Sequence, residues 1–139
     1  MKKEKKSPKH LKHKPIISVN NYSQNDAMYA NDTDAVALSI GKAQWDSNQI
    51  SLKVWRHTGK KWSRQSEELP IHRNLDLSIL FLSTLLSETS DNDIESIFTF
   101  FVDNHKDVSQ IKIFYEQNKR FIKPRIQELK KLLDKVLTN

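Results

Sequence analysis

Residues 62–86 read WSRQSEELPIHRNLDLSILFLSTLL, and in this stretch a polar cluster runs directly into an apolar segment. The second half, residues 75–86, has only four polar side chains. This run is too short to span a bilayer, but it suits a helix that is buried on most sides. Pro70 fits the first helical position, because its missing N–H would have no partner there. We therefore predict a helix from Pro70 to about Leu86 with a polar cluster at its beginning.

The residues before this helix predict a β-hairpin. Residues 50–57 alternate apolar and polar side chains, which is typical of a strand with one apolar face. The Thr-Gly pair at 58–59 supplies a turn, and residues 60–66 return as the second strand. The hairpin, over about residues 50–66, is the centre of the sheet that we expect.

The length of this turn fixes which side chains face one another. We expect Trp55 opposite Trp62, and Lys53 opposite Arg64 on the same face. A cross-strand tryptophan pair adds about 0.5–1 kcal/mol to a plain pair. Two opposed cations repel each other, so we expect a nearby carboxylate or a ligand anion to neutralise them.

The other elements follow from capping residues, turn-rich composition and apolar spacing. Pro124 would clash inside a helix, so we expect a break near Lys123 and a last amphipathic helix after it. The predicted segments are an edge strand at 16–19, a loop at 20–32, helices that begin near 31–33 (ending near Trp45), 91–92 and 107–109, and the last helix at 126–137. Together they predict an α+β fold, a small antiparallel sheet packed against four or five α-helices.

Lysines near the N-terminus account for the charge of the chain. The formal net charge is +6, and residues 1–14 hold seven lysines and one glutamate, which is the same net charge. The rest of the chain balances 16 basic against 16 acidic residues. A lysine-rich segment with few apolar residues cannot offset the entropy cost of ordering. We therefore predict a disordered basic tail at 1–14 and a single domain over residues 15–139.

Several classes of site are excluded by residues that the chain lacks. It has no cysteine, which excludes disulfides, zinc–thiolate sites and cysteine nucleophiles. Its two glycines cannot build a phosphate-cradling loop, and its histidines lack metal-ligand spacing, so we expect no cofactor and no metal. No stretch reads as a signal peptide or a membrane span, so we expect a cytoplasmic protein without a membrane partner.

The polar cluster admits a catalytic and a structural interpretation. His72 and Asp76 are four residues apart, so the carboxylate would orient the imidazole on one helix face. With Glu67 and Glu68 they would serve as acid–base groups on a phosphorylated or nucleotide substrate. Alternatively, Arg73 pairs with Asp76 and the cluster only holds the hairpin against the helix. We favour the structural interpretation, because acid–base sites are a small minority of such clusters.

The hairpin also offers a surface for a ligand or partner. The candidate residues are Trp55, Trp62, Arg64, Gln65 and Arg73. Tryptophan stacks on flat rings and arginine pairs with anions, so this surface suits a protein or an anionic small molecule such as a nucleotide. Burial of the tryptophan pair under residues 15–30 is the alternative, since tryptophan carries a large apolar area.

The C-terminal segment carries a basic run and an apolar stripe. Lys119, Arg120, Lys123 and Arg125, together with the N-terminal tail, would contact nucleic-acid phosphates. The last helix has apolar residues at helical spacing, and such a stripe would drive homodimerisation if it has only one packing partner.

Three blocks of the chain are K-H-K-P-I-I at 12–17, D-A-V-A-L-S-I-G-K-A-Q-W at 34–45 and V-W-R-H-T-G-K-K-W-S-R-Q-S-E-E-L-P-I-H-R at 54–73. They resemble an uncharacterised family of small bacterial proteins of unknown function, over about residues 12–80. The resemblance implies an origin in bacteria, or in a phage or mobile element of bacteria, and no mechanism.

We therefore predict a non-enzymatic bacterial, phage or mobile-element protein with a binding or regulatory role. Its partner would be a protein or an anionic ligand, held by the tryptophan and arginine face of the hairpin. One alternative is a small enzyme that uses His72 with nearby carboxylates. The other is a nucleic-acid-binding protein.

Overall fold

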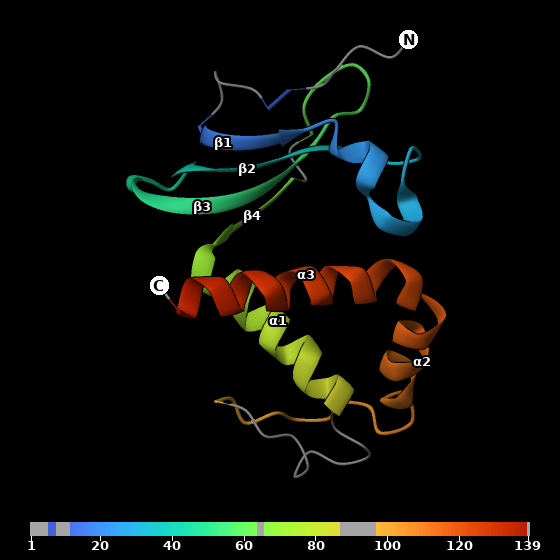
Figure 1. Ribbon diagram of the computed structural model, residues 1–139. Helices are drawn as coiled ribbons and strands as arrows, with labels where there is room; N and C mark the ends of the chain where they lie inside the picture. The colour runs from blue at the N-terminus through green and yellow to red at the C-terminus, as the bar shows by residue number, and fades with distance from the viewer. Residues whose placement is uncertain (1–5, 8–11, 64–65, 87–96, 139) are drawn as a thin grey trace. The chain divides into compact units, whose positions relative to one another are not determined.

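The computed structural model describes residues 6–7, 12–63, 66–86 and 97–138 (Figure 1). The chain divides into two compact units, Met1–Leu77 and Ser78–Asn139. The first unit holds the sheet and the beginning of helix α1 (Ile71–Leu86), and the second holds the rest of α1 with two further helices. The single domain that we predicted over residues 15–139 stays a prediction.

The first unit is built on a four-stranded antiparallel sheet in the order β1-β2-β3-β4. The strands are β1 (Lys14–Asn20), β2 (Ala35–Ala43), β3 (Asp46–Arg56) and β4 (Glu67–Pro70), and two 3-10 turns, η1 (Tyr22–Asn25) and η2 (Ala27–Tyr29), connect β1 to β2. Neighbours in the sheet are also neighbours in the sequence, so no connection crosses over another strand of the sheet. The predicted edge strand at 16–19 is confirmed within β1, and the strand at 50–57 is confirmed as the main part of β3.

The helix that we predicted to end near Trp45 is wrong, because its residues form β2. Alanine-rich composition suggested a helix, but residues 35–43 alternate in size. Every second residue, Ala35, Ala37, Ser39, Gly41 and Ala43, is small and buried. The intervening residues are larger, and this period of two places one kind of side chain on each face of a sheet.

Small residues are required on this face because other backbone lies close to it. A Cβ at Gly41 would overlap the carbonyl group of Lys14 and would lie 2.8 Å from the Cα of Pro15. The register of β1 against β2 shifts between Pro15 and Ile17, at the same place. Gly41 therefore lets β1 approach β2 at an irregularity that any side chain would obstruct.

The register of the predicted hairpin is wrong. The turn spans residues 58–61 rather than 58–59: the N–H of Thr58 donates to the carbonyl of Lys61 (2.9 Å), and Gly59 adopts φ of 98°. As a result, His57 pairs with Trp62 in an isolated bridge. The strand that returns is β4, which is later than the predicted 60–66 and places Lys53 opposite Glu68.

The described part of the chain contains three α-helices, α1, α2 (Ser109–Gln117) and α3 (Lys119–Leu137), rather than four or five. The helix predicted from Pro70 to Leu86 is confirmed as α1, although Pro70 itself ends β4. The expectation that this helix is buried on most sides is wrong, because Ser83 is the only buried residue of α1 and Leu75, Leu77 and Leu80 are more than 40% exposed. Residues 97–102 are not helical, and the beginning of the helix predicted there lies outside the described residues. The predicted break at Pro124 is also wrong, because α3 begins before it and continues through it. A proline this close to the beginning of a helix removes only one backbone hydrogen bond from a long ladder.

The second unit is held together by aromatic contacts. The rings of Phe81 in α1 and Tyr115 in α2 lie edge to face at 6.4 Å. Asn118 separates α2 from α3, and its N–H donates to the carbonyl groups of Phe114 and Tyr115. No residue of α2 or α3 that the structure describes is fully buried, so these helices have no core of their own.

The boundary of the N-terminal tail is also earlier than predicted. Lys14 begins β1, and His13 is fully buried. Ser7 also contacts the sheet, because its N–H donates to the side chain of Asn20 and its hydroxyl lies 2.6 Å from that of Ser18. His13 is held in place by contacts with the side chains of Ser39 and Ser51.

Candidate functional site

A chain of buried polar side chains crosses the face of the sheet on which the small residues of β2 lie. The indole N–H of Trp55 donates to Ser39 Oγ (2.8 Å), and Ser39 Oγ lies 2.9 Å from His13 Nε2. His13 Nδ1 lies 2.9 Å from Ser51 Oγ, which donates to Glu68 Oε2 (2.7 Å). The chain thus links the segment before β1 to β2, β3 and β4.

These contacts fix the tautomer of the neutral His13 imidazole. Ser51 gives its only proton to Glu68, so it must accept the bond from His13, and Nδ1 carries a hydrogen. Ser39 accepts from Trp55 and can then donate its own proton to Nε2. In this arrangement every donor has an acceptor when the imidazole is neutral.

The pKa values agree with a neutral imidazole beside a charged carboxylate. Burial lowers the pKa of His13 below 6.5, although the negative charge of Glu68 partly opposes this. Burial alone would raise the pKa of Glu68, but hydrogen bonds from Ser51 and from the N–H of Gln44 outweigh it. Together with the charges of His13 and Lys53, they lower the pKa of Glu68 below 4.5.

Lys53 provides the charge that balances Glu68. Its Nζ lies 3.5 Å from Glu68 Oε1 and 4.1 Å from the centre of the Trp55 ring. The Trp55 ring contacts Trp62 edge to face at 5.6 Å, and Trp62 contacts His57 at 4.9 Å. The predicted Trp55–Trp62 contact therefore forms, despite the different register, and the carboxylate of Glu68 neutralises Lys53.

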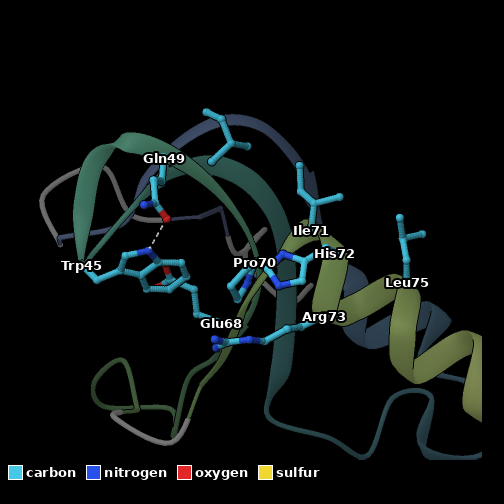
Figure 2. A pocket seen from close by; sticks show the side chains of 9 residues that line it. Trp45, Gln49, Glu68, Pro70, Ile71, His72, Arg73 and Leu75 are labelled. Carbon is cyan, nitrogen blue, oxygen red and sulfur yellow. Dashed lines mark hydrogen bonds between the residues drawn. The ribbon is translucent and has the colours of Figure 1, made fainter. Parts of the chain in front are cut away.

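A cavity of about 720 Å³ opens beside Glu68, at the junction of β4 and α1 (Figure 2). All of its lining residues belong to the first unit. They are Trp45, Gln49, Ile50, Glu68, Pro70, Ile71, His72, Arg73 and Leu75. Trp45 is held in place at the rim, because its indole N–H donates to Gln49 Oε1 (2.9 Å). The cavity therefore combines an aromatic wall, an apolar wall and three ionisable side chains.

Arg73 extends from α1 toward the side of the cavity where Trp45 and Glu68 lie (Figure 2). Within the described part of the chain, the guanidinium group of Arg73 makes no ion pair or hydrogen bond. The predicted Arg73–Asp76 pair is therefore absent, and so is the predicted orientation of His72 by Asp76. The side chains of His72 and Arg73 are both exposed. Arg73 is a cation that lines a cavity without a protein anion to neutralise it.

The beginning of α1 adds positive potential at the same place. The first N–H groups of a helix have no partner within the helix, and they carry a partial positive charge. α1 begins at Ile71, and its first turn contains no acidic residue. The partial charge of the helix end and the charge of Arg73 therefore have the same sign.

The remaining predicted site residues lie elsewhere. The exposed fraction of Trp55 is 1%, so its ring lies in the core and not on a contact surface. Glu67 lies on the opposite face of β4 from Glu68 and pairs with Arg56 (2.6 Å). Arg64 and Gln65 lie outside the described residues. Of the basic run, Lys119, Arg120, Lys123 and Arg125 lie in α3, in the second unit.

Five further side chains complete the site: His13, Ser39, Ser51, Lys53 and Trp45. Sequence reasoning placed Lys53 on the tryptophan face of the hairpin, beside a neutralising anion, and gave the other four no role. The alternation of small residues along 35–43 is the signal that would have placed Ser39 on the inner face. His13 carries no comparable signal, because its neighbours are lysines. Among the described residues, no group of three histidine or acidic side chains gathers in a way that would hold a metal ion.

The other face of the sheet carries a mainly apolar groove beside Glu67. Alternate positions on neighbouring strands line a groove of about 470 Å³, among them Ile17, Val19, Leu38, Ile40 and Leu52. Of these, Ile17, Val19 and Ile40 are more than 40% exposed. Within the described part of the chain, no helix is long and apolar enough to cross a membrane.

Of the comparisons with known proteins, the one with protein-family models gives a match. Residues 5–98 match the model of a family of unknown function (DUF6530). The match covers β1 to α1 and the cavity, and it ends before α2 and α3. No curated protein and no solved structure gives a match. The resemblance to an uncharacterised family is thereby confirmed, over a longer stretch than residues 12–80.

Proposed function

We propose that this chain, which belongs to the DUF6530 family of unknown function, is a non-enzymatic binding protein that holds a small anionic molecule in the cavity at the beginning of α1. The observation that carries the proposal is the position of Arg73. It lines the cavity and makes no ion pair with any residue that the structure describes. An arginine in such a place is a donor for a carboxylate or a phosphate.

The balance of charge around the cavity supports an anion rather than a cation. Glu68 is the only acidic residue among the lining side chains, and its side chain is 3% exposed. Its charge is already matched by Lys53 and by hydrogen bonds from Ser51 and Gln44. Arg73 and the beginning of α1 therefore both favour an anion at the opening of the cavity.

The shape of the cavity supports a molecule of nucleotide size. Its volume of about 720 Å³ lies within the range of small-molecule sites, about 300–1,000 Å³. Trp45 offers a flat ring with a fixed orientation, on which a planar group would stack. Ile50, Pro70 and Ile71 provide apolar contacts beside it. A ligand with one flat ring and one anionic group would use each of these features.

Thermal unfolding with defined probes tests this proposal. The probes are AMP, inorganic phosphate and, as a cationic counterpart, spermidine. We expect AMP to raise the melting temperature in a saturable manner, phosphate to do so weakly and spermidine to have no such effect. A ligand at a hundredfold excess over its Kd stabilises the folded state by about 2.7 kcal/mol.

Two substitutions make the test specific for the cavity. Arg73→Ala should remove the response to AMP, whereas Lys61→Ala removes an exposed cation of the same unit that does not line the cavity, and it should leave the response unchanged. Equal loss of the response in both variants would mean that AMP binds through net charge, and the proposed site would be abandoned.

A further inference from the structure

Helix α3 presents two unlike surfaces along its length. Its apolar residues recur at spacings of three and four, from Ile122 through Ile126 and Leu129 to Leu133 and Val136. Such spacing places them on one side of a helix. Lysine and arginine occupy most of the other side, and residues 119–137 contain seven basic and two acidic residues, which leaves a net charge of +5.

The apolar side of α3 is open to solvent at its C-terminal end. Leu132 and Leu133 are 48% and 43% exposed, and Val136 and Leu137 are 68% and 80% exposed. Nothing in α3 that the structure describes is buried. An exposed run of large aliphatic side chains on a charged helix is costly in water, and such a run marks a contact surface.

Several cations of α3 are also without protein partners. Lys130 pairs with Asp134 (3.4 Å), and Lys119 pairs with Glu116 (3.4 Å). In contrast, the ammonium groups of Lys123, Lys131 and Lys135 make no ion pair or hydrogen bond within the described part of the chain. The helix therefore presents unneutralised positive charge beside exposed apolar side chains.

We propose that α3 lies on the surface of an anionic lipid bilayer, with its apolar side in the headgroup region and its lysines against the lipid phosphates. A helix that lies flat on a bilayer needs a strong separation of apolar and basic sides and no membrane-spanning length. α3 is about 28 Å long by helix geometry and meets the first condition.

Charge and apolar exposure favour an anionic bilayer over the two other partners that the helix could have, a second copy of the chain and a nucleic acid. A second copy of the chain would bring a second helix of net charge +5, and like charges repel. A nucleic acid would neutralise the lysines but would leave Leu133, Val136 and Leu137 in water. An anionic bilayer engages both sides at once, since each lysine near its surface is attracted to the lipid charge.

The test uses the full-length chain and co-sedimentation with lipid vesicles. One set of vesicles contains phosphatidylserine and phosphatidylcholine, and the other contains phosphatidylcholine alone. We expect at least tenfold stronger partitioning to the anionic vesicles, and we expect the difference to shrink at high salt. Equal partitioning to both sets would overturn the proposal.

Matched variants separate α3 from the rest of the basic chain. The triple variant K123E/K131E/K135E should lose at least tenfold in partitioning. The control K60E/K61E/K106E changes the net charge equally at exposed lysines outside α3, and it should lose less than twofold. The variant L133S/V136S should also lose tenfold, because these side chains enter the headgroup region.

Three outcomes would contradict the lipid surface. Equal losses in the two triple variants would mean that binding follows net charge alone. Protein that sediments as a dimer, and as a monomer after L133S/V136S, would assign the apolar side to a second copy. Retention of duplex DNA that is lost only in K123E/K131E/K135E, with no vesicle binding, would assign the lysines to nucleic acid.

Discussion

In water, the imidazole of His13 would be partly protonated near neutral pH, whereas its buried site favours the neutral form. Protonation would turn Nε2 into a donor, so Ser39 Oγ would accept from both His13 and Trp55 and its own proton would lose Nε2 as an acceptor. The sheet therefore stabilises the neutral imidazole, and the number of protons that the chain releases on folding depends on this residue.

The lowered pKa of His13 predicts that acid destabilises the protein in two steps. Between its folded pKa and 6.5, the unfolded chain binds more protons than the folded chain, so unfolding becomes easier as the pH falls from about 6.5. Glu68 adds the same effect as the pH falls below about 4.5, because its pKa is also lowered. Urea unfolding at pH 7.5, 6.0 and 5.0 measures the first step.

His13→Gln serves as the matched variant, because glutamine keeps a polar group but does not titrate. Its free energy of unfolding should depend less on pH between 7.5 and 5.0 than that of the wild type. His72→Gln is the control, since His72 is exposed. An unchanged pH dependence in His13→Gln would show that another group controls the acid response.

The close approach of β1 to Gly41 leads to a second prediction about a single residue. Gly41→Ala should cost about 1–3 kcal/mol of stability, the usual cost of overpacking, because the new Cβ meets the backbone of Lys14 and Pro15. Gly59→Ala is the control: no atom lies within 4 Å of the new Cβ, and its φ of 98° leaves only backbone strain. We expect Gly41→Ala to melt below Gly59→Ala, and the reverse order would mean that β1 can move away from β2.

Single residues also show why the site was only partly predictable. Arg73 and the contact of Trp55 with Trp62 follow from local sequence. Glu68 was predicted to act with His72, but its partners His13, Ser51 and Lys53 come from other strands. A strand register that differs by a few residues changes every such pair, and the turn at 58–61 fixes that register through hydrogen bonds of Thr58 that the sequence alone does not reveal.

At the scale of elements, β4 separates two neighbouring glutamates by their environment. Glu67 lies on the outer face, where it and Asp34 pair with Arg56, and all three side chains are more than 30% exposed. Glu68 points to the inner face, where its side chain is 3% exposed and its partners are Lys53 and the chain that begins at Ser51. One strand of four residues therefore carries one weak and one strong electrostatic contact.

Isosteric substitutions should reveal this difference. Glu67→Gln should change the free energy of unfolding by less than about 1 kcal/mol, as exposed ion pairs do. Glu68→Gln should cost about 3 kcal/mol, because it leaves Lys53 beside a neutral group in a buried place. Chemical denaturation of both variants measures this, and similar costs for the two would place Glu68 in a wetter environment than the structure gives it.

The predicted elements succeeded where the pattern was long and strongly periodic. The helix near Pro70–Leu86 has a long apolar run and the strand at 50–57 alternates apolar and polar residues, and both elements were confirmed. The alanine-rich segment at 35–43 failed because helix propensity and strand alternation coexist in it, and packing against Trp55 and β1 selects the strand. Propensity is a weak guide when tertiary contacts oppose it.

At the scale of the whole molecule, the two units differ in how they are stabilised. The first unit buries Trp55, alanines of β2 and a complete chain of hydrogen bonds. In the second unit, α3 has no buried residue in the part that the structure describes. Segments with few buried contacts open at a lower free energy than the core of the same protein.

The rate of backbone hydrogen exchange should therefore differ between the two units. Backbone amides of β2 and β3 should exchange most slowly, and amides of α3 should exchange at least tenfold faster in the absence of lipid. Mass spectrometry of exchanged peptides measures both regions in one experiment. Protection of α3 equal to that of β2 would mean that the apolar side of α3 is already covered, and its exposure to a partner would be ruled out.

The central claim is that the cavity at the beginning of α1 binds an anion through Arg73, and the three tryptophans of the chain provide internal reporters for it. The measurement is a titration of AMP into ¹⁵N-labelled protein, read at the three indole N–H resonances. We expect a saturable shift of the Trp45 resonance, little movement of the resonances of Trp55 and Trp62, and no shift of any of them in Arg73→Ala. A Trp45 resonance that does not move with AMP, or that moves equally in Arg73→Ala, would contradict the account.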